Sequence, residues 1–146
     1  MSSARVSPVR VAVVGAGHLG RFHAQKFSQI PECQLIAISD SSAERGKTVG
    51  EELKVQNVTN YKDLIGKVDA VTIATPTLTH FEVAQFFLEN GVHVHVEKPM
   101  TATVKEAETL CALAEAKGLV LQVGHVERFN PALIAAKKKL EVPLFI

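Results

Sequence analysis

Three glycines at Gly15, Gly17 and Gly20 give the segment VVGAGHLG the spacing Gly-x-Gly-x-x-Gly. The segment joins an apolar run with the composition of a strand to a stretch with the periodicity of a helix. In that setting the glycines allow, in turn, a tight turn, backbone approach to a pyrophosphate, and close packing of helix on strand. The phosphate charge then lies at the helix N-terminus. We therefore predict a dinucleotide-binding turn, with His18 and Leu19 among the residues that contact the cofactor.

An acidic residue, Asp40, closes the second predicted strand 20 residues after Gly20. A carboxylate at that place accepts hydrogen bonds from the ribose hydroxyl groups of adenosine and repels a 2′-phosphate. It favours NAD as the cofactor, which a glycine-rich turn alone would not do. Arg45 follows five residues later and has the charge to pair with a 2′-phosphate, so the sequence does not exclude NADP. Without a ligand, Asp40 would be an ordinary helix-start residue and Arg45 a solvated one.

Polar residues follow three further predicted strands. Thr75-Pro76 come after the fourth strand, Glu97-Lys98-Pro99 after the fifth, and His125 after the sixth. Ligands of an open parallel sheet bind outside the carboxyl ends of its strands, so all three clusters are expected at the cofactor's edge. The alternative for Glu97 and Lys98 is a surface ion pair at a strand end.

The elements that must position these residues follow a regular order. Short runs rich in Val and Ile alternate with helical stretches, and most of the runs are apolar throughout, as strands covered on both faces must be. We predict an α/β fold, a Rossmann-type doubly wound parallel sheet with helices on both faces. The predicted strands cover residues 9–15, 35–40, 55–58, 69–75, 92–96 and 119–124, and the predicted helices cover 18–29, a stretch from 41, 79–90, 103–117 and a stretch from 130.

Composition limits the classes of partner. The chain has 146 residues, 47% of them hydrophobic, which suits one compact domain. A net charge of +1 offers no field for nucleic acid or an anionic membrane, so neither partner is expected. The polar start MSSARVSP and the lack of an apolar run of about 20 residues predict a cytoplasmic protein.

Two residue types raise the question of metals and disulfides. His93 and His95 share one side of their predicted strand, but no cysteine or acidic cluster completes a ligand set, so no metal is predicted. Cys33 and Cys111 are the two cysteines, and Cys111 falls in an apolar helical stripe. That pattern predicts a reduced thiol in the core.

Several motifs, in order along nearly the whole chain, resemble the N-terminal domain of the glucose-fructose oxidoreductase and inositol dehydrogenase family, Gfo/Idh/MocA. The most specific is Glu97-Lys98-Pro99 after its strand. VGHVERFNPAL, residues 123–133, resembles the branch that oxidises nucleotide-linked amino sugars, such as UDP-N-acetylglucosamine 3-dehydrogenases. The other matching motifs are GAGHLG followed by His23, Thr75-Pro76 with His80, and GVHV leading into the Glu-Lys-Pro segment.

The resemblance implies hydride transfer between a nicotinamide and a hydroxyl-bearing carbon of a sugar or nucleotide sugar, in particular of a UDP-amino sugar. It implies that Lys98 contacts the reacting hydroxyl group and assists its proton transfer, a role that suits a lysine because its charge stabilises an alkoxide. Glu97 would lie near the nicotinamide ribose, and Glu97 and Lys98 would both contact the cofactor. The remaining residues divide into a cofactor side, Thr75, Pro76 and His80, and a substrate side, His125 and Arg128.

Family members also carry a second domain that binds the sugar, and they are expected to be homo-oligomers at full length. EVPLFI begins what the pattern predicts to be another strand, without a turn to finish it. We expect residues 1–8 to be a flexible N-terminus, 9–141 the dinucleotide-binding domain, and 142–146 the start of an absent substrate domain. Residues 1–146 alone are then expected to be inactive.

Two other functions compete with the dehydrogenase. One is a non-catalytic NAD(H)-binding module that senses the redox state of the cofactor, and the other is a purely structural α/β domain. A sensor needs the glycines and Asp40 but has no use for an oriented base, so Lys98 discriminates between sensor and enzyme. The structural reading leaves the glycine pattern unexplained.

Overall fold

A computed structural model describes residues 7–137 of the chain. The expectations for residues 1–6 and 138–146, including the strand predicted at 142–146, lie outside the described residues. The described part forms one parallel sheet of six strands in the order β3-β2-β1-β4-β5-β6. The strands are β1 (Val9–Val14), β2 (Cys33–Ser39), β3 (Gln56–Val58), β4 (Ala70–Ile73), β5 (His93–Val96) and β6 (Leu121–Val123).

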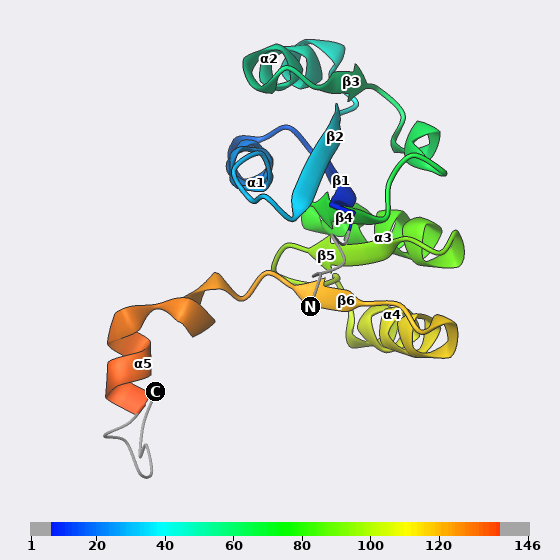
Figure 1. Ribbon diagram of the computed structural model, residues 1–146. Helices are drawn as coiled ribbons and strands as arrows, with labels where there is room; N and C mark the ends of the chain where they lie inside the picture. Colours follow the sequence, from blue (N-terminus) through cyan, green and yellow to red (C-terminus); the bar gives the residue numbers. More distant parts are fainter. Residues whose placement is uncertain (1–6, 138–146) are drawn as a thin grey trace, which may run out of the picture.

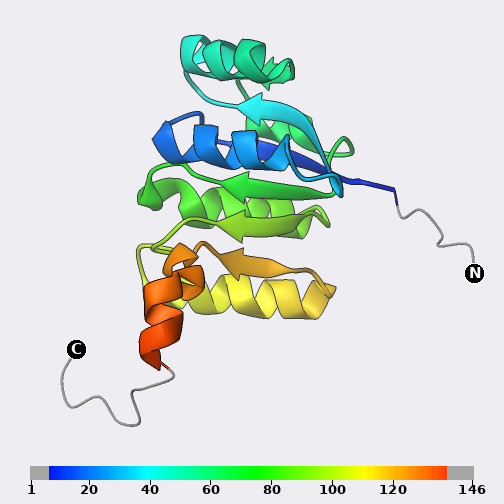
Figure 2. The same cartoon turned by 60° about the vertical axis from the view of Figure 1, so that its left-hand side comes forward.

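This strand order is that of the doubly wound fold predicted from the sequence. From β1 the chain moves outward through β2 to β3, then returns to the other side of β1 and moves outward through β4, β5 and β6 (Figure 2). The direction reverses between β1 and β4, which pair in parallel with each other. Ligand sites in such sheets lie beside this reversal, at the carboxyl ends of the strands.

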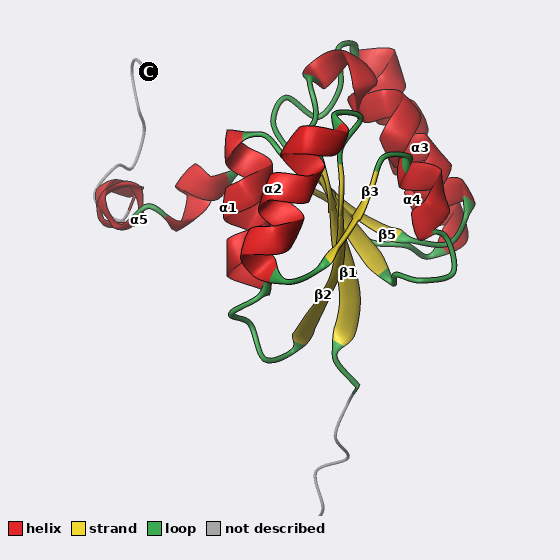
Figure 3. Cartoon of the chain, turned by 90° about the horizontal axis from the view of Figure 1, so that it is seen from above, coloured by secondary structure: helices red, strands yellow, loops and turns green. Residues whose placement is uncertain are grey.

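The helices cover both faces of the sheet. Figure 3 shows α1 (His18–Phe27) and α2 (Ala43–Leu53) on one face, and α3 (His80–Glu89) and α4 (Val104–Lys117) on the other. The larger core cluster lies under α3 and α4, where the side chains of Phe87, Leu88 and Leu110 are fully buried. Burying one such side chain contributes about 1.5–3 kcal/mol, so this cluster holds the central strands in register.

Local signals in the sequence explain where the helices begin and end. The capping box of α4 is complete, with Thr103 accepting from the Glu106 amide and the Glu106 carboxylate accepting from the Thr103 amide. The same helix ends at Gly118, whose φ of 64° lies in the left-handed region. The capping residue of α2 is Ser42, one residue later than predicted. The shift arises because Asp40 already binds the Ser42 amide.

One prediction about the core is wrong. Cys111 is exposed on α4 instead of buried, and Val104 of the same predicted stripe is also exposed. The buried positions of α4 are Leu110 and Ala114. The small residues of this helix leave its apolar stripe poorly defined. The buried face is therefore shifted by one residue from the predicted face, and Leu110 is buried in place of Cys111.

The end of the described chain stands away from the sheet. After β6, a short 3-10 helix η3 (Val126–Phe129) leads into α5 (Pro131–Lys137), and Figure 1 shows α5 apart from the layered body. Phe129 and Leu133 are strongly exposed there. Two further 3-10 helices, η1 (Tyr61–Leu64) and η2 (Thr77–Thr79), flank β4. Between residues 7 and 137, no helix is both long and apolar enough to cross a membrane.

Candidate functional site

A large cavity of about 760 Å³ opens at the carboxyl ends of β1, β2 and β4, beside the reversal of strand order. Its volume lies within the range typical of small-molecule and cofactor sites. We call it the large cavity. Eight of the residues that the sequence singled out contribute to its wall, namely Gly15, Gly17, His18, Leu19, Asp40, Arg45, Thr75 and Pro76. Gly20, His80, Glu97 and Lys98 are not in that wall.

The three glycines of the turn have different surroundings. Gly15 has a φ of +100°, and a Cβ on it would lie 2.6 Å from the carbonyl oxygen of Ala74. A Cβ on Gly20 would overlap the carbonyl oxygen of Gly15. A Cβ on Gly17 would meet nothing within 4 Å. Packing therefore requires glycine at positions 15 and 20, whereas at 17 it keeps open a space in the wall of the large cavity.

The N-terminus of α1 faces this space, and no acidic residue of the helix itself offsets its charge. Gly17 is the residue that caps the helix, no side chain binds the cap, and the first turn holds no acidic residue. The free N–H groups of such a terminus carry about half a positive charge in effect. That arrangement is suited to the phosphates of a dinucleotide.

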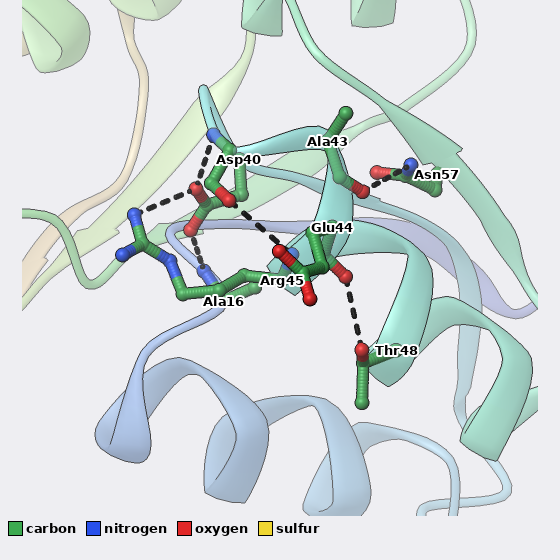
Figure 4. Close-up of polar contacts among 8 residues, drawn as sticks. Ala16, Asp40, Ala43, Glu44, Arg45, Thr48 and Asn57 are labelled. Carbon is green, nitrogen blue, oxygen red and sulfur yellow. Dashed lines mark hydrogen bonds and ion pairs between the residues drawn. The ribbon is translucent and has the colours of Figure 1, made fainter.

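Asp40 organises the turn as well as facing the cavity. It is only 7% exposed, and its two oxygens accept from the amides of Ala16 and Ser42, each at 2.8 Å, and from Arg45 Nη2 at 3.0 Å (Figure 4). Burial raises the pKa of the Asp40 carboxyl, but the hydrogen bonds from Arg45 and the two amides lower it more, so its pKa lies below the usual value. A carboxylate has about four acceptor positions, so the three contacts leave capacity for a ligand hydroxyl group.

The segments that follow β4 and β5 are joined by His80. This ring is 1% exposed and is not in the wall of the large cavity. Its Nδ1 lies 2.9 Å from the carbonyl oxygen of Pro99, and its Nε2 lies 2.8 Å from that of Thr75. Nearby, the hydroxyl group of Thr79 contacts that of Thr75 at 2.8 Å. Direct contact of His80 with a cofactor thus stays a prediction, while its contacts with these two segments are part of the fold.

Glu97 is held by a residue to which the sequence analysis gave no role. His23 on α1 places Nε2 2.8 Å from Glu97 Oε1, and the Lys98 amide donates to Glu97 Oε2 at 3.2 Å. Burial raises the pKa of Glu97, but the hydrogen bonds from His23 and the Lys98 amide outweigh it, and the pKa lies below its usual value. Gly124 lies against the same carboxylate, since a Cβ there would be 3.0 Å from Oε1. The only sequence signal for His23 was its place three residues after Gly20.

His95 packs its ring edge-on against that of His23, with centroids 5.2 Å apart. Burial lowers the pKa of His95, and the charge of His23 lowers it further against the opposing effect of Glu97. The neutral ring is therefore favoured. Within residues 7–137, no three histidine, cysteine, aspartate or glutamate side chains gather as a metal site would require.

A second cavity, of about 550 Å³, adjoins Glu97 at the carboxyl ends of β5 and β6. His125 and Arg128, the two residues predicted on the substrate side, line it together with His23, His95 and Glu97. Lys98 is exposed and is in the wall of neither cavity. Among the described residues, the Glu97 carboxylate pairs with His23, and no ion pair joins it to the Lys98 ammonium group.

Comparison with known proteins assigns the chain to a family. Residues 9–125 match the Gfo/Idh/MocA oxidoreductase family, described by its NAD-binding Rossmann fold. The chain belongs to this family. Membership confirms the resemblance seen in the sequence, the Rossmann fold, and NAD as the cofactor of this Gfo/Idh/MocA domain.

Two relatives and two solved structures illustrate the match. The chain is 45% identical over 125 residues to UDP-N-acetylglucosamine 3-dehydrogenase of Acidithiobacillus ferrooxidans, covering 86% of this chain and 39% of that enzyme. It is 34% identical over 137 residues to scyllo-inositol 2-dehydrogenase (NAD(+)) of Bacillus subtilis, covering 91% and 40%. The structure of the Acidithiobacillus enzyme, GnnA, aligns with a TM-score of 0.85 at 42% identity over 92% of this chain and 44% of that one.

GenD2 from gentamicin A biosynthesis, solved in complex with NAD, aligns with a TM-score of 0.89 at 28% identity. The alignment covers 95% of this chain and 40% of GenD2. The chain thus spans about 40% of the length of the curated Gfo/Idh/MocA relatives that it matches. The roles of single residues remain predictions on this basis.

Proposed function

We propose that the protein carrying this chain transfers a hydride between NAD and a hydroxyl-bearing carbon of a nucleotide-linked sugar, in particular a UDP-amino sugar. The observation that carries the proposal is the large cavity, where the open space at Gly17, the free N-terminus of α1 and the carboxylate of Asp40 meet. The choice of sugar is supported by the 45% identity with the UDP-N-acetylglucosamine 3-dehydrogenase.

In the proposed reaction, the amine of Lys98 accepts the proton of the substrate hydroxyl group as the carbon gives up its hydride and a carbonyl group forms. NAD supplies the hydride acceptor when it is bound. Two side chains of the second cavity, His125 and Arg128, suit the diphosphate of a nucleotide sugar, because a guanidinium group binds phosphate oxygens in pairs. His23 keeps the carboxylate of Glu97 next to the Lys98 amide.

A redox-sensing module that binds NAD(H) without catalysis is the alternative. The observation that fits it is the exposure of Lys98 outside both cavity walls. We extend the main proposal to a full-length protein that is cytoplasmic and homo-oligomeric and that needs no nucleic acid. The two free cysteines are in keeping with the cytoplasm, and the net charge of +1 is in keeping with the lack of a nucleic-acid partner.

Turnover with a panel of sugars distinguishes enzyme from sensor. With NAD present, UDP-amino sugars are expected to drive formation of reduced nicotinamide by the protein carrying this chain, and the matching free sugars are expected to be at least about tenfold poorer in kcat/KM, since they lack the phosphates. Absorbance of reduced nicotinamide measures both. A protein that binds NAD tightly but reduces it with no sugar of the panel would support the sensor.

The cofactor preference tests the role of Asp40. We expect NAD to bind at least about tenfold more tightly than NADP, because the buried carboxylate accepts from the 2′-hydroxyl group and repels a 2′-phosphate. Titration calorimetry with both cofactors measures the ratio. Asp40→Asn should narrow it, and Arg45→Ala should widen it, since Arg45 lies 3.0 Å from Asp40 and offsets its charge.

Lys47→Ala is the matched control for this measurement. Lys47 is another exposed cation on α2, but its ammonium group lies 3.7 Å from Glu51, not near Asp40. The NAD to NADP ratio of this variant should equal that of the parent. Equal or reversed affinities in the parent protein would show that Arg45 sets the preference and that Asp40 does not.

A further inference from the structure

Two segments that leave the sheet side by side carry residues of the proposed site. After β4, Thr75 enters the wall of the large cavity, and after β5, Lys98 and Pro99 lead away from Glu97. The last ladder contact between them is the hydrogen bond from the Glu97 amide to the Ile73 carbonyl, at 2.9 Å. Beyond it, proline occurs in both segments, at 76 and 99, and proline has no N–H with which to continue the ladder.

His80 bridges the two segments at the place where the ladder ends. Its ring is fully buried, and its two nitrogens lie 2.8 Å from the Thr75 carbonyl oxygen and 2.9 Å from the Pro99 carbonyl oxygen. Both distances fall within the range of strong N–H···O hydrogen bonds. A carbonyl oxygen can only accept, so the donor in each contact is the imidazole. A neutral ring donates to one of the two carbonyls, and the doubly protonated ring donates to both.

We propose that His80 is a positioning residue for Lys98. It fixes the Lys98-Pro99 segment relative to Thr75 in the wall of the large cavity, acting through the backbone carbonyl groups of Thr75 and Pro99. The inference rests on the proposed function, in which Lys98 is the proton acceptor. It assigns to a buried histidine a role that its residue type alone does not reveal.

The contacts of His80 matter for the position of Lys98 because of how Lys98 is held. Its side chain is exposed and lies in neither cavity wall, so its direction depends on its backbone. On one side the Lys98 amide donates to Glu97, which His23 holds at 2.8 Å. On the other side the next residue, Pro99, is held by His80. A displacement of about 1 Å at a reacting group can reduce a rate by about a hundredfold, so loss of either anchor affects catalysis.

Two substitutions separate the hydrogen bonds of His80 from its volume. His80→Phe keeps a buried ring without a donor, and His80→Gln keeps an amide donor for one carbonyl group. In the full-length protein we expect kcat to fall by about thirtyfold to a hundredfold for His80→Phe and by less for His80→Gln. The Kd for NAD should change by less than about threefold, because Gly15 to Gly20 and Asp40 are untouched.

His93→Phe is the matched control. His93 is a partly buried histidine whose Nδ1 accepts from the Val120 amide at 3.0 Å, but it lies at the opposite end of β5 from Glu97. Its replacement should leave kcat within about twofold of the parent value. A parallel loss of kcat in His93→Phe would mean that general destabilisation explains the effect, and the proposal would be wrong.

Amide hydrogen exchange tests whether His80 holds the Lys98-Pro99 segment, without any assay of turnover. In His80→Phe, the amides of Lys98 and of residues 100–102 should exchange about tenfold faster than in the parent, while those of β2 stay unchanged. Unchanged exchange at these amides would overturn the proposal, and the same measurement is made on His80→Gln if His80→Phe does not fold. Faster exchange in His80→Phe together with full activity of Lys98→Ala would show that His80 holds the segment and would refute the proposed role of Lys98.

Discussion

Replacement of Lys98 with alanine is expected to lower kcat of the full-length protein by about a hundredfold to ten-thousandfold, the usual range for a positioned acid or base. The Kd for NAD should change by less than about threefold, because the contacts that we assign to the pyrophosphate and the adenosine ribose lie in the large cavity, whose wall does not include Lys98. Steady-state kinetics at saturating NAD and sugar, with calorimetric titration of NAD, measure the two quantities separately.

Two companion variants make the result specific. Lys105→Ala removes an exposed lysine from α4, and its kcat should match that of the parent. Lys98→Arg keeps the positive charge in a group that does not lose its proton in proteins, so it tests proton transfer apart from charge. Turnover of Lys98→Arg close to that of the parent would limit Lys98 to electrostatic stabilisation, and weakened NAD binding by Lys98→Ala with unchanged kcat would defeat the assignment altogether.

The sheet and its helices could be predicted because their signals are local. Strands covered on both faces must be apolar throughout, and the segments around Val11, Ile38 and Val71 satisfy this rule, with each of these side chains buried. The helix predicted over 103–117 agrees with α4 (Val104–Lys117) to within one residue, and its end was marked by the glycine at 118. Where the pattern was weak, as at Cys111, the predicted face of the helix was wrong.

The contacts inside the site could not be predicted, because they join residues that are distant in the sequence. His23 and Glu97 are separated by 74 positions, and Asp40 and Ala16 by 24. The residue types of Asp40 and Glu97, and their positions at the ends of predicted strands, were enough to predict the edge of the sheet at which they lie. Their hydrogen-bond partners depend on how α1 lies across the strands. For the same reason, the contacts of the His80 ring with the carbonyl groups of Thr75 and Pro99 could not be predicted, and its contact with the cofactor stays a prediction.

The glycine turn offers the clearest separation of folding from binding. Gly20→Ala is expected to lower the free energy of unfolding by about 3 kcal/mol or more, because the new Cβ overlaps the Gly15 carbonyl oxygen, a backbone atom that cannot move aside easily. Gly17→Ala is expected to change it by less than about 1 kcal/mol, because the φ of −70° at Gly17 suits alanine and its Cβ meets no protein atom within 4 Å, while alanine is a poorer N-cap residue than glycine. Urea unfolding without cofactor measures both changes.

The affinity for NAD should respond strongly to substitution at Gly17, although the free energy of unfolding changes little. Its Cβ would enter the wall of the large cavity beside the N-terminus of α1, the place we assign to the pyrophosphate, so the Kd of Gly17→Ala for NAD should rise at least about tenfold. Gly118→Ala is the control, because it strains a φ of +64° at the end of α4 with no part in the cavity, and should cost some stability but no affinity. Parent-like NAD binding by Gly17→Ala would show that the phosphates lie elsewhere.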